Sequence, residues 1–124
     1  QRNLDKKGIT QSKKIGQFFK NNKIKIDIVL SSEWCRCKDT AKYAFQNFET
    51  FNALNSFYDV RFEANEAKQV KDLKNYIKNW DDDKNLVLVT HFVVISSILN
   101  TSSYSGEIII SDKYLNIIGS VNTM

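Results

Sequence analysis

The segment Asn85–Ile95, NLVLVTHFVVI, constrains the fold of this chain more than any other part. Its apolar residues Leu86–Val89 form a short run that is typical of a strand buried on both faces of a parallel sheet. Thr90 and His91 interrupt the run without Gly or Pro, and a second apolar run follows at once. We interpret the segment as strand, tight turn and helix. His91, the only histidine, then lies at the carboxyl end of a central strand and beside a helix N-terminus, where open α/β sheets bind anions.

A second segment repeats this order. The isoleucine-rich stretch Ile24–Leu30 predicts a strand. Ser31–Ser32 form a polar turn, and the apolar spacing in residues 34–48 predicts a helix. Two such strand–helix units on one parallel sheet bring both polar turns to the same edge. Arg36, in this turn or in the first turn of the helix, is then expected to face His91.

The remaining segments complete an α/β pattern. Asp5 can cap a helix over residues 8–21, and Glu63–Trp80 has the clearest helical stripe of apolar residues. Residues 49–62 predict a loop or short strand, and residues 107–110 and 116–121 predict a hairpin at the edge of the sheet. We therefore expect one domain over residues 1–124, with three α/β/α layers and a mostly parallel sheet.

Composition narrows the classes of function. The 124 residues are 42% hydrophobic, enough for a core, and no apolar run approaches the ~18–20 residues of a membrane span. The net charge is +4, but the lysines are scattered and form no dense basic stripe. Solvated helix faces explain them better than nucleic-acid binding does. We therefore expect no nucleic-acid partner and no membrane span.

Cys35 and Cys37 are the only cysteines. They are one residue apart, too close for an ordinary disulfide, and they lack the further ligands of a zinc site. We expect two reduced thiols and no metal. Such thiols are compatible with a cytoplasmic protein and with an exported one.

The residues expected at the sheet edge have the chemistry of an oxyanion site. The planar guanidinium of Arg36 matches phosphate oxygens, and His91 can donate one N–H or, when protonated, two. Ser32 and Thr40 add hydroxyl groups nearby. These four residues are the predicted phosphate-binding residues, and no cofactor is expected.

These segments together resemble the histidine phosphatase, or phosphoglycerate-mutase-like, superfamily. The resemblance is carried by QRNLDKKGITQSKKIG, VLSSEWCRCKDTAKYAF, NLVLVTHFVVIS and SGEI. Their order and spacing resemble the family's G-x-x-Q helix, its S-S-x-x-x-R-x-x-x-T-A segment and its late strand that ends in histidine. The branch that the chain resembles most includes proteins named as lipopolysaccharide-core heptose phosphatases.

The resemblance implies phosphoryl transfer through a phosphohistidine intermediate, without a metal. Arg36 matches the second arginine that clamps the phosphate. His91 matches the second histidine, which steadies the transferring group and is not the nucleophile. Both are therefore candidate catalytic residues. Arg2 and Asn3 match the family's first loop, at the mouth of the pocket. The implied substrate is a phosphorylated small molecule or a phosphoprotein.

Two parts of the family pattern are missing. The family's nucleophilic histidine belongs to an Arg-His-Gly motif on a first strand, and this chain contains no such motif. We expect a domain truncated at its N-terminus that lacks its first central strand and is inactive without it. The alternative is a degenerate relative that is a non-catalytic phosphate-binding or scaffold module.

The general acid is the second difference. Many relatives that act on oxygen esters carry Leu-x-Glu, where this chain has Leu54-Asn55-Ser56. Asp59 and Glu63, and with less support Glu66, are candidate general acids. Relatives that act on phosphohistidine proteins manage without this acid, because an imidazole leaving group is easier to expel.

Overall fold

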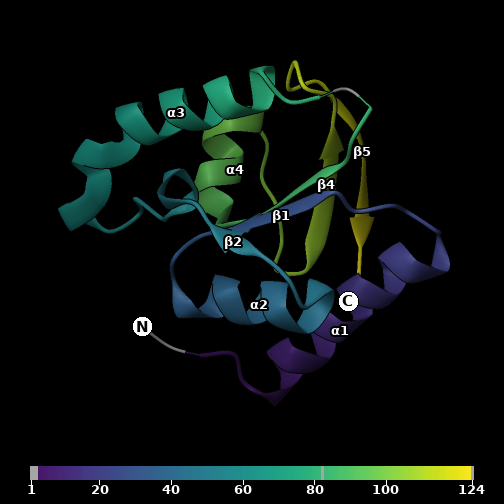
Figure 1. Ribbon diagram of the computed structural model, residues 1–124. Helices are drawn as coiled ribbons and strands as arrows, with labels where there is room; N and C mark the ends of the chain where they lie inside the picture. Colours follow the sequence, from purple (N-terminus) through teal and green to yellow (C-terminus); the bar gives the residue numbers. More distant parts are fainter. Residues whose placement is uncertain (1–2, 82, 124) are drawn as a thin grey trace.

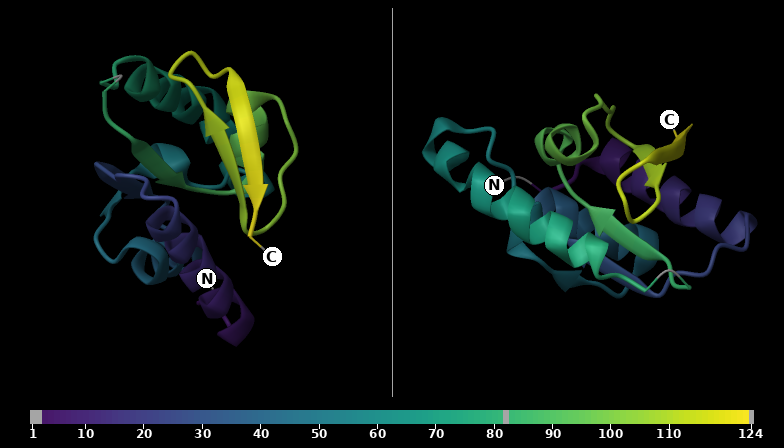
Figure 2. Two further views of the ribbon diagram at one scale, coloured as in Figure 1. Left: turned by 90° about the vertical axis from the view of Figure 1, so that its right-hand side faces the viewer. Right: turned by 90° about the horizontal axis from the view of Figure 1, so that it is seen from above.

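The computed structural model describes residues 3–81 and 83–123, which form three layers (Figure 1). The middle layer contains a parallel sheet with the strand order β2-β1-β3. Its strands are β1 (Ile28–Ser31), β2 (Glu49–Thr50) and β3 (Leu86–Val89). Helices α1 (Lys6–Asn21) and α2 (Cys35–Phe45) lie on one side of the sheet, and α3 (Glu66–Lys78) and α4 (Phe92–Leu99) on the other (Figure 1, Figure 2). The predicted α/β class is confirmed.

Single residues account for the start of helix α1 and for its close packing against α2. The Asp5 carboxylate accepts the backbone N–H of Gly8 at 2.8 Å, the N-cap bond that the sequence predicted. Gly16 is buried against α2, where an added Cβ would overlap the carbonyl oxygen of Ala44. A glycine at this position therefore lets the two helix backbones approach closely, which offsets its low helix propensity.

The core lies between the sheet and the helices α3 and α4. Leu54 and Leu73 are fully buried, and Leu30, Phe57 and Val94 pack in the same cluster. Leu54 ends the short 3-10 helix η1 (Asn52–Leu54). A second 3-10 helix, η2 (Val60–Asn65), precedes α3, so the helix expected from Glu63 begins as a 3-10 turn.

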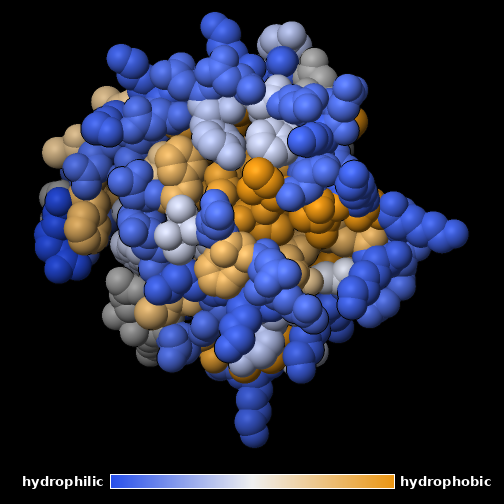
Figure 3. Space-filling view, viewed as in Figure 1, coloured by the Kyte–Doolittle hydropathy of each residue, from blue (hydrophilic) through white to orange (hydrophobic). Residues whose placement is uncertain are grey.

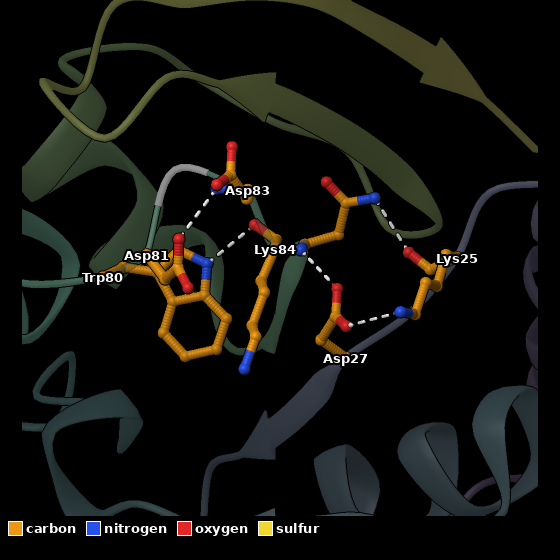
Figure 4. Close-up of polar contacts among 7 residues, drawn as sticks. Lys25, Asp27, Trp80, Asp81, Asp83 and Lys84 are labelled. Atoms are coloured by element: carbon orange, nitrogen blue, oxygen red, sulfur yellow. Dashed lines mark hydrogen bonds and ion pairs between the residues drawn. The ribbon is translucent and has the colours of Figure 1, made fainter.

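The segments that precede β1 and β3 are tied together by polar contacts (Figure 4). The Asp27 carboxylate accepts the backbone N–H of Asn85 at 2.7 Å, and the Asn85 amide donates to the backbone oxygen of Lys25 at 2.8 Å. The indole N–H of Trp80 donates to the backbone oxygen of Lys84 at 2.8 Å. Lys25 and Asp27 thus bind Asn85 ahead of the sheet, and β1 begins only at Ile28. The strand predicted from Ile24 was therefore too long.

Strand β3 is the edge of the parallel sheet in the described part of the chain, where it pairs with β1 alone. The central position expected for this strand was therefore wrong, and its four residues are only partly buried. The hairpin of β4 (Glu107–Ser111) and β5 (Ile117–Asn122) forms a separate antiparallel sheet, whereas we had expected it at the edge of the parallel one.

Apolar side chains gather in the middle of the face shown in Figure 3. Ile28 and Ile110 are 39% and 40% exposed.

Two further expectations concern the rest of the chain. Across residues 3–81 and 83–123, no helix combines the length and apolar character that a membrane span requires. Arg2, which we matched to the family's first loop, lies outside the described residues, whereas Asn3 is described and exposed.

Candidate functional site

The polar turns after β1 and β3 meet at one edge of the sheet. The two strands pair in parallel, with Ser31 opposite Val89. The backbone N–H of Ser32 continues the ladder and donates to the carbonyl oxygen of Val89 at 2.9 Å. The residues that follow β1 and β3 are therefore neighbours, as expected from two strand–helix units on one parallel sheet.

His91 lies at this edge, and its side chain is partly shielded from solvent. Its Nε2 is 2.9 Å from the Ser32 hydroxyl and 3.6 Å from the sulfur of Cys37. The Trp34 ring packs edge-on against the imidazole at a centroid distance of 5.0 Å. Burial, and to a smaller degree the positive charge of Arg36, lower the pKa of His91 from 6.5 to about 4. The imidazole is therefore neutral at pH 7.

Cys37 is a buried neighbour of His91 in this cluster. Burial raises the pKa of its thiol to about 11, although a hydrogen bond with Ser32 and the charge of Arg36 act in the opposite direction. The thiol is therefore protonated at neutral pH and is a poor nucleophile. Cys37 is a free thiol, and the expectation of two reduced cysteines stays a prediction. Within the part of the chain that the structure describes, no group of three or more His, Cys, Asp or Glu side chains could hold a metal ion.

Arg36 supplies the positive charge at the edge. It lies in the first turn of α2, is exposed, and its charge lowers the pKa values of both His91 and Cys37. Neither α2 nor α4 has a side chain that caps its N-terminus. The positive ends of both helix dipoles therefore add to the guanidinium, and the arrangement favours an anion.

Thr40 lies one helical turn beyond Arg36. Its hydroxyl donates to the backbone oxygen of Arg36 at 2.9 Å, so its proton is used within α2. The structure brings Ser32 and His91 into direct contact with the charge of Arg36 nearby. The role of Thr40 as a phosphate donor stays a prediction.

The candidate general acids have other contacts. The Asp59 carboxylate pairs with Arg61 at 3.0 Å, and hydrogen bonds from Arg61 lower the pKa of Asp59. A general acid needs the opposite shift. Glu63 and Glu66 line a shallow hollow near Ser97, whose hydroxyl donates to Glu66 at 3.1 Å. Their role as acids stays a prediction.

Asn55 is a member of the site that the sequence analysis missed. Its side-chain oxygen accepts the Ser32 hydroxyl at 3.1 Å and the backbone N–H of Glu33 at 2.8 Å. We considered the segment Leu54-Asn55-Ser56 only as a position for a general acid. Ser56 is buried, and its hydroxyl accepts the backbone N–H of Tyr58 at 3.2 Å. No local signal in the sequence identifies Asn55, because its partners Ser32 and Glu33 are more than twenty residues away in the chain.

Two solved structures are among those that the fold of this chain resembles. The structure of the protein histidine phosphatase SixA complexed with tungstate matches with a TM-score of 0.77 at 15% identity, over 98% of this chain and 85% of that one. The crystal structure of TTHB049 from Thermus thermophilus matches with a TM-score of 0.70 at 13% identity, over 96% and 84% of the two chains. No family model and no curated protein matches the sequence.

Proposed function

The chain has the histidine phosphatase-like, or phosphoglycerate-mutase-like, fold, and we propose that it belongs to a phosphatase that works through a phosphohistidine. The observation that carries the proposal is the meeting of Ser32 and His91 at 2.9 Å, beside the charge of Arg36 and the uncapped N-termini of α2 and α4. This edge offers a phosphoryl group the charge of Arg36 and the backbone N–H groups of two helix N-termini, and electrostatic stabilisation of this kind usually supplies the largest share of catalysis in phosphoryl transfer.

Arg36 and His91 have different tasks in this proposal. Arg36 is charged at all relevant pH values and binds two phosphate oxygens through its planar fork. His91 is neutral before binding because its pKa is about 4. A phosphate dianion next to the imidazole favours the protonated form, so binding raises the pKa of His91. His91 then donates a charge-assisted hydrogen bond to the transferring group.

In this proposal the nucleophile is a second histidine supplied from outside residues 1–124, because the family resemblance matches His91, the only histidine here, to the histidine that steadies the transferring group. The imidazole nitrogen of this second histidine attacks phosphorus as the leaving group departs, and water then cleaves the P–N bond to release phosphate. The open edge of β3 is the place where such a segment would pair. A strand added there in parallel would end at the same edge as His91. We therefore expect residues 1–124 alone to bind phosphate without hydrolysing it.

The substrate that we favour is a phosphoprotein with phosphohistidine. Asp59, one of the candidate acids, is paired with Arg61 and has a lowered pKa. An imidazole leaving group needs less help from such an acid than an alcohol does. The likeness to SixA, which is a protein histidine phosphatase, supports the same choice. A small phosphate ester is the alternative substrate, in keeping with the resemblance to the heptose phosphatase branch.

The first experiment tests anion binding. Phosphate or tungstate is titrated while NMR follows the ring signals of His91, whose assignment is simple because the chain has one histidine. We expect either anion to raise the pKa of His91. Arg36→Gln should weaken binding on the order of tenfold, because a charge-assisted hydrogen bond contributes about 1.5 kcal/mol or more. Arg61→Gln is the matched control, since Arg61 pairs with Asp59. Unchanged His91 signals at millimolar anion would refute the proposal.

The second experiment distinguishes catalysis from simple binding. The single histidine specifically favours the alternative of a non-catalytic phosphate-binding or scaffold module. The longer protein that contains any natural upstream segment is incubated with phosphohistidine-containing protein and with sugar phosphates. Trapping of phosphate on a histidine outside residues 1–124 supports the phosphatase. A rise in melting temperature with phosphate, but no turnover in the longer protein, supports the scaffold.

A further inference from the structure

A chain of hydrogen bonds links Glu33 to His91 through the side chains of Asn55 and Ser32. The Asn55 amide nitrogen donates to the Glu33 carboxylate at 2.9 Å, and the Asn55 side-chain oxygen accepts the backbone N–H of Glu33 at 2.8 Å. The same oxygen lies 3.1 Å from the Ser32 hydroxyl, which lies 2.9 Å from Nε2 of His91. Segments far apart in the sequence thus converge on one imidazole nitrogen.

The orientation of the Asn55 amide is fixed by chemistry. Its nitrogen is a donor only and faces a carboxylate oxygen, whereas its oxygen faces a backbone N–H. Rotating the amide by 180° would place N–H against N–H and oxygen against carboxylate. The backbone of Asn55 is held as well, because the Gln69 side chain donates to its carbonyl oxygen at 2.7 Å. The side-chain oxygen therefore presents a firm acceptor to Ser32.

The Ser32 hydroxyl has one proton to donate, and the fixed acceptor on Asn55 takes it. The Ser32 oxygen then acts as an acceptor toward its other neighbours, including the backbone N–H of Trp34 at 3.2 Å. The hydrogen bond between Ser32 and His91, at 2.9 Å, must consequently be donated by Nε2–H of His91. The Cys37 thiol at 3.6 Å is the competing donor to Nε2, but S–H is a weak one.

We propose that Asn55 is a positioning residue that holds neutral His91 in the Nε2–H tautomer through Ser32. The inference deepens the proposed function, on which its catalytic meaning rests. Because Nε2 already carries a proton, Nδ1 is the nitrogen that becomes protonated when an anion makes His91 cationic. The contacts of the ring with Ser32 and Cys37 are both made by Nε2. Asn55 thus determines which nitrogen of the His91 ring takes up the second proton and becomes a new hydrogen-bond donor.

The test is a long-range ¹H–¹⁵N NMR spectrum of the single histidine at pH 7, which separates the two tautomers. Since one hydrogen bond contributes about 1 kcal/mol net, the Nε2–H form should exceed the other by roughly fivefold or more. In Asn55→Ala the Ser32 proton is released and can turn toward Nε2, so the ratio should fall to about one or below. Asn55→Asp keeps an acceptor oxygen for Ser32 but places its second oxygen against the Glu33 carboxylate, so it is combined with Glu33→Gln, and this double variant should restore the Nε2–H form.

The matched control is Asn52→Ala, which removes an exposed asparagine from η1, the short helix that precedes Asn55. It should leave the tautomer ratio unchanged. A wild-type protein in which His91 is mostly in the Nδ1–H form would overturn the inference. This measurement needs no variant, so the inference can be tested even if Asn55→Ala folds poorly. An unchanged ratio in folded Asn55→Ala would overturn it as well.

Titration with phosphate separates this inference from the proposed function. If the tautomer follows Asn55 but phosphate does not shift the His91 signals, the proposed function fails and the positioning role stands. If phosphate raises the pKa of His91 but the tautomer ratio is the same in the wild type and in Asn55→Ala, the anion site stands and Asn55 has no positioning role. We expect a smaller pKa rise in Asn55→Ala than in the wild type.

Discussion

Protonation of His91 should cost this fold stability in mildly acidic solution. The pKa of the imidazole is about 4 in the folded state, against an ordinary value of 6.5, mainly because burial beside Trp34 and Cys37 penalises the charged form. The unfolded chain therefore binds a proton on His91 at a higher pH than the folded chain does. Stability that is present above about pH 6.5 is lost progressively as the pH falls toward 4.

The size of the effect follows from the two pKa values. At about 1.36 kcal/mol per pH unit, the interval from 6.5 to about 4 corresponds to about 3 kcal/mol. His91 is only half-buried, so solvent screening reduces the expected loss to roughly 1–2 kcal/mol. Removing the charge in Arg36→Gln should raise the pKa of His91 only in part, because burial is the larger cause.

The assay compares urea unfolding of the wild type and of His91→Asn between pH 4 and pH 7. Asp27, Asp59 and Asp112 have lowered pKa values and also lose stabilising interactions in acid, but they do so in both proteins. The difference between the two curves therefore isolates the imidazole. Parallel curves over this range, or an NMR pKa of His91 near 6.5 in the folded protein, would show that the reasoning is wrong.

Three further predictions concern the scaffold, and each is measured by urea or thermal unfolding. Gly16→Ala should destabilise the fold by about 1–3 kcal/mol because its Cβ meets the backbone of α2. Gly8→Ala meets mainly the side chain of a neighbouring leucine, so a smaller loss or a gain is expected, and equal losses would contradict this reading. Leu73→Ala should cost about 2–5 kcal/mol because Leu73 is fully buried in the core. Lys74→Ala on the exposed side of the same helix should change stability by less than about 0.5 kcal/mol. Asp5→Ala should cost about 1 kcal/mol through loss of the N-cap bond, and an unchanged midpoint would exclude that role.

Local patterns in the sequence determined the two strand–helix units and their relation. The apolar run Leu86–Val89 followed by Thr90-His91 predicted β3 and α4, and both are present. Asp5 predicted the start of α1. Parallel pairing of the two predicted strands was enough to bring the residues after them to one edge. Such signals are readable because strand alternation, helical spacing and capping depend on residues close together in the chain.

The tertiary structure alone decided how that edge works. Asn55 reaches Ser32 and Glu33 across more than twenty residues of chain, and Asn85 binds Asp27 across nearly sixty. The low pKa of His91 and the open edge of β3 likewise depend on which segments pack beside them and which do not. Periodicity shows which side of an element is apolar. Desolvation and long-range hydrogen bonds instead depend on contacts that exist only once the chain is folded.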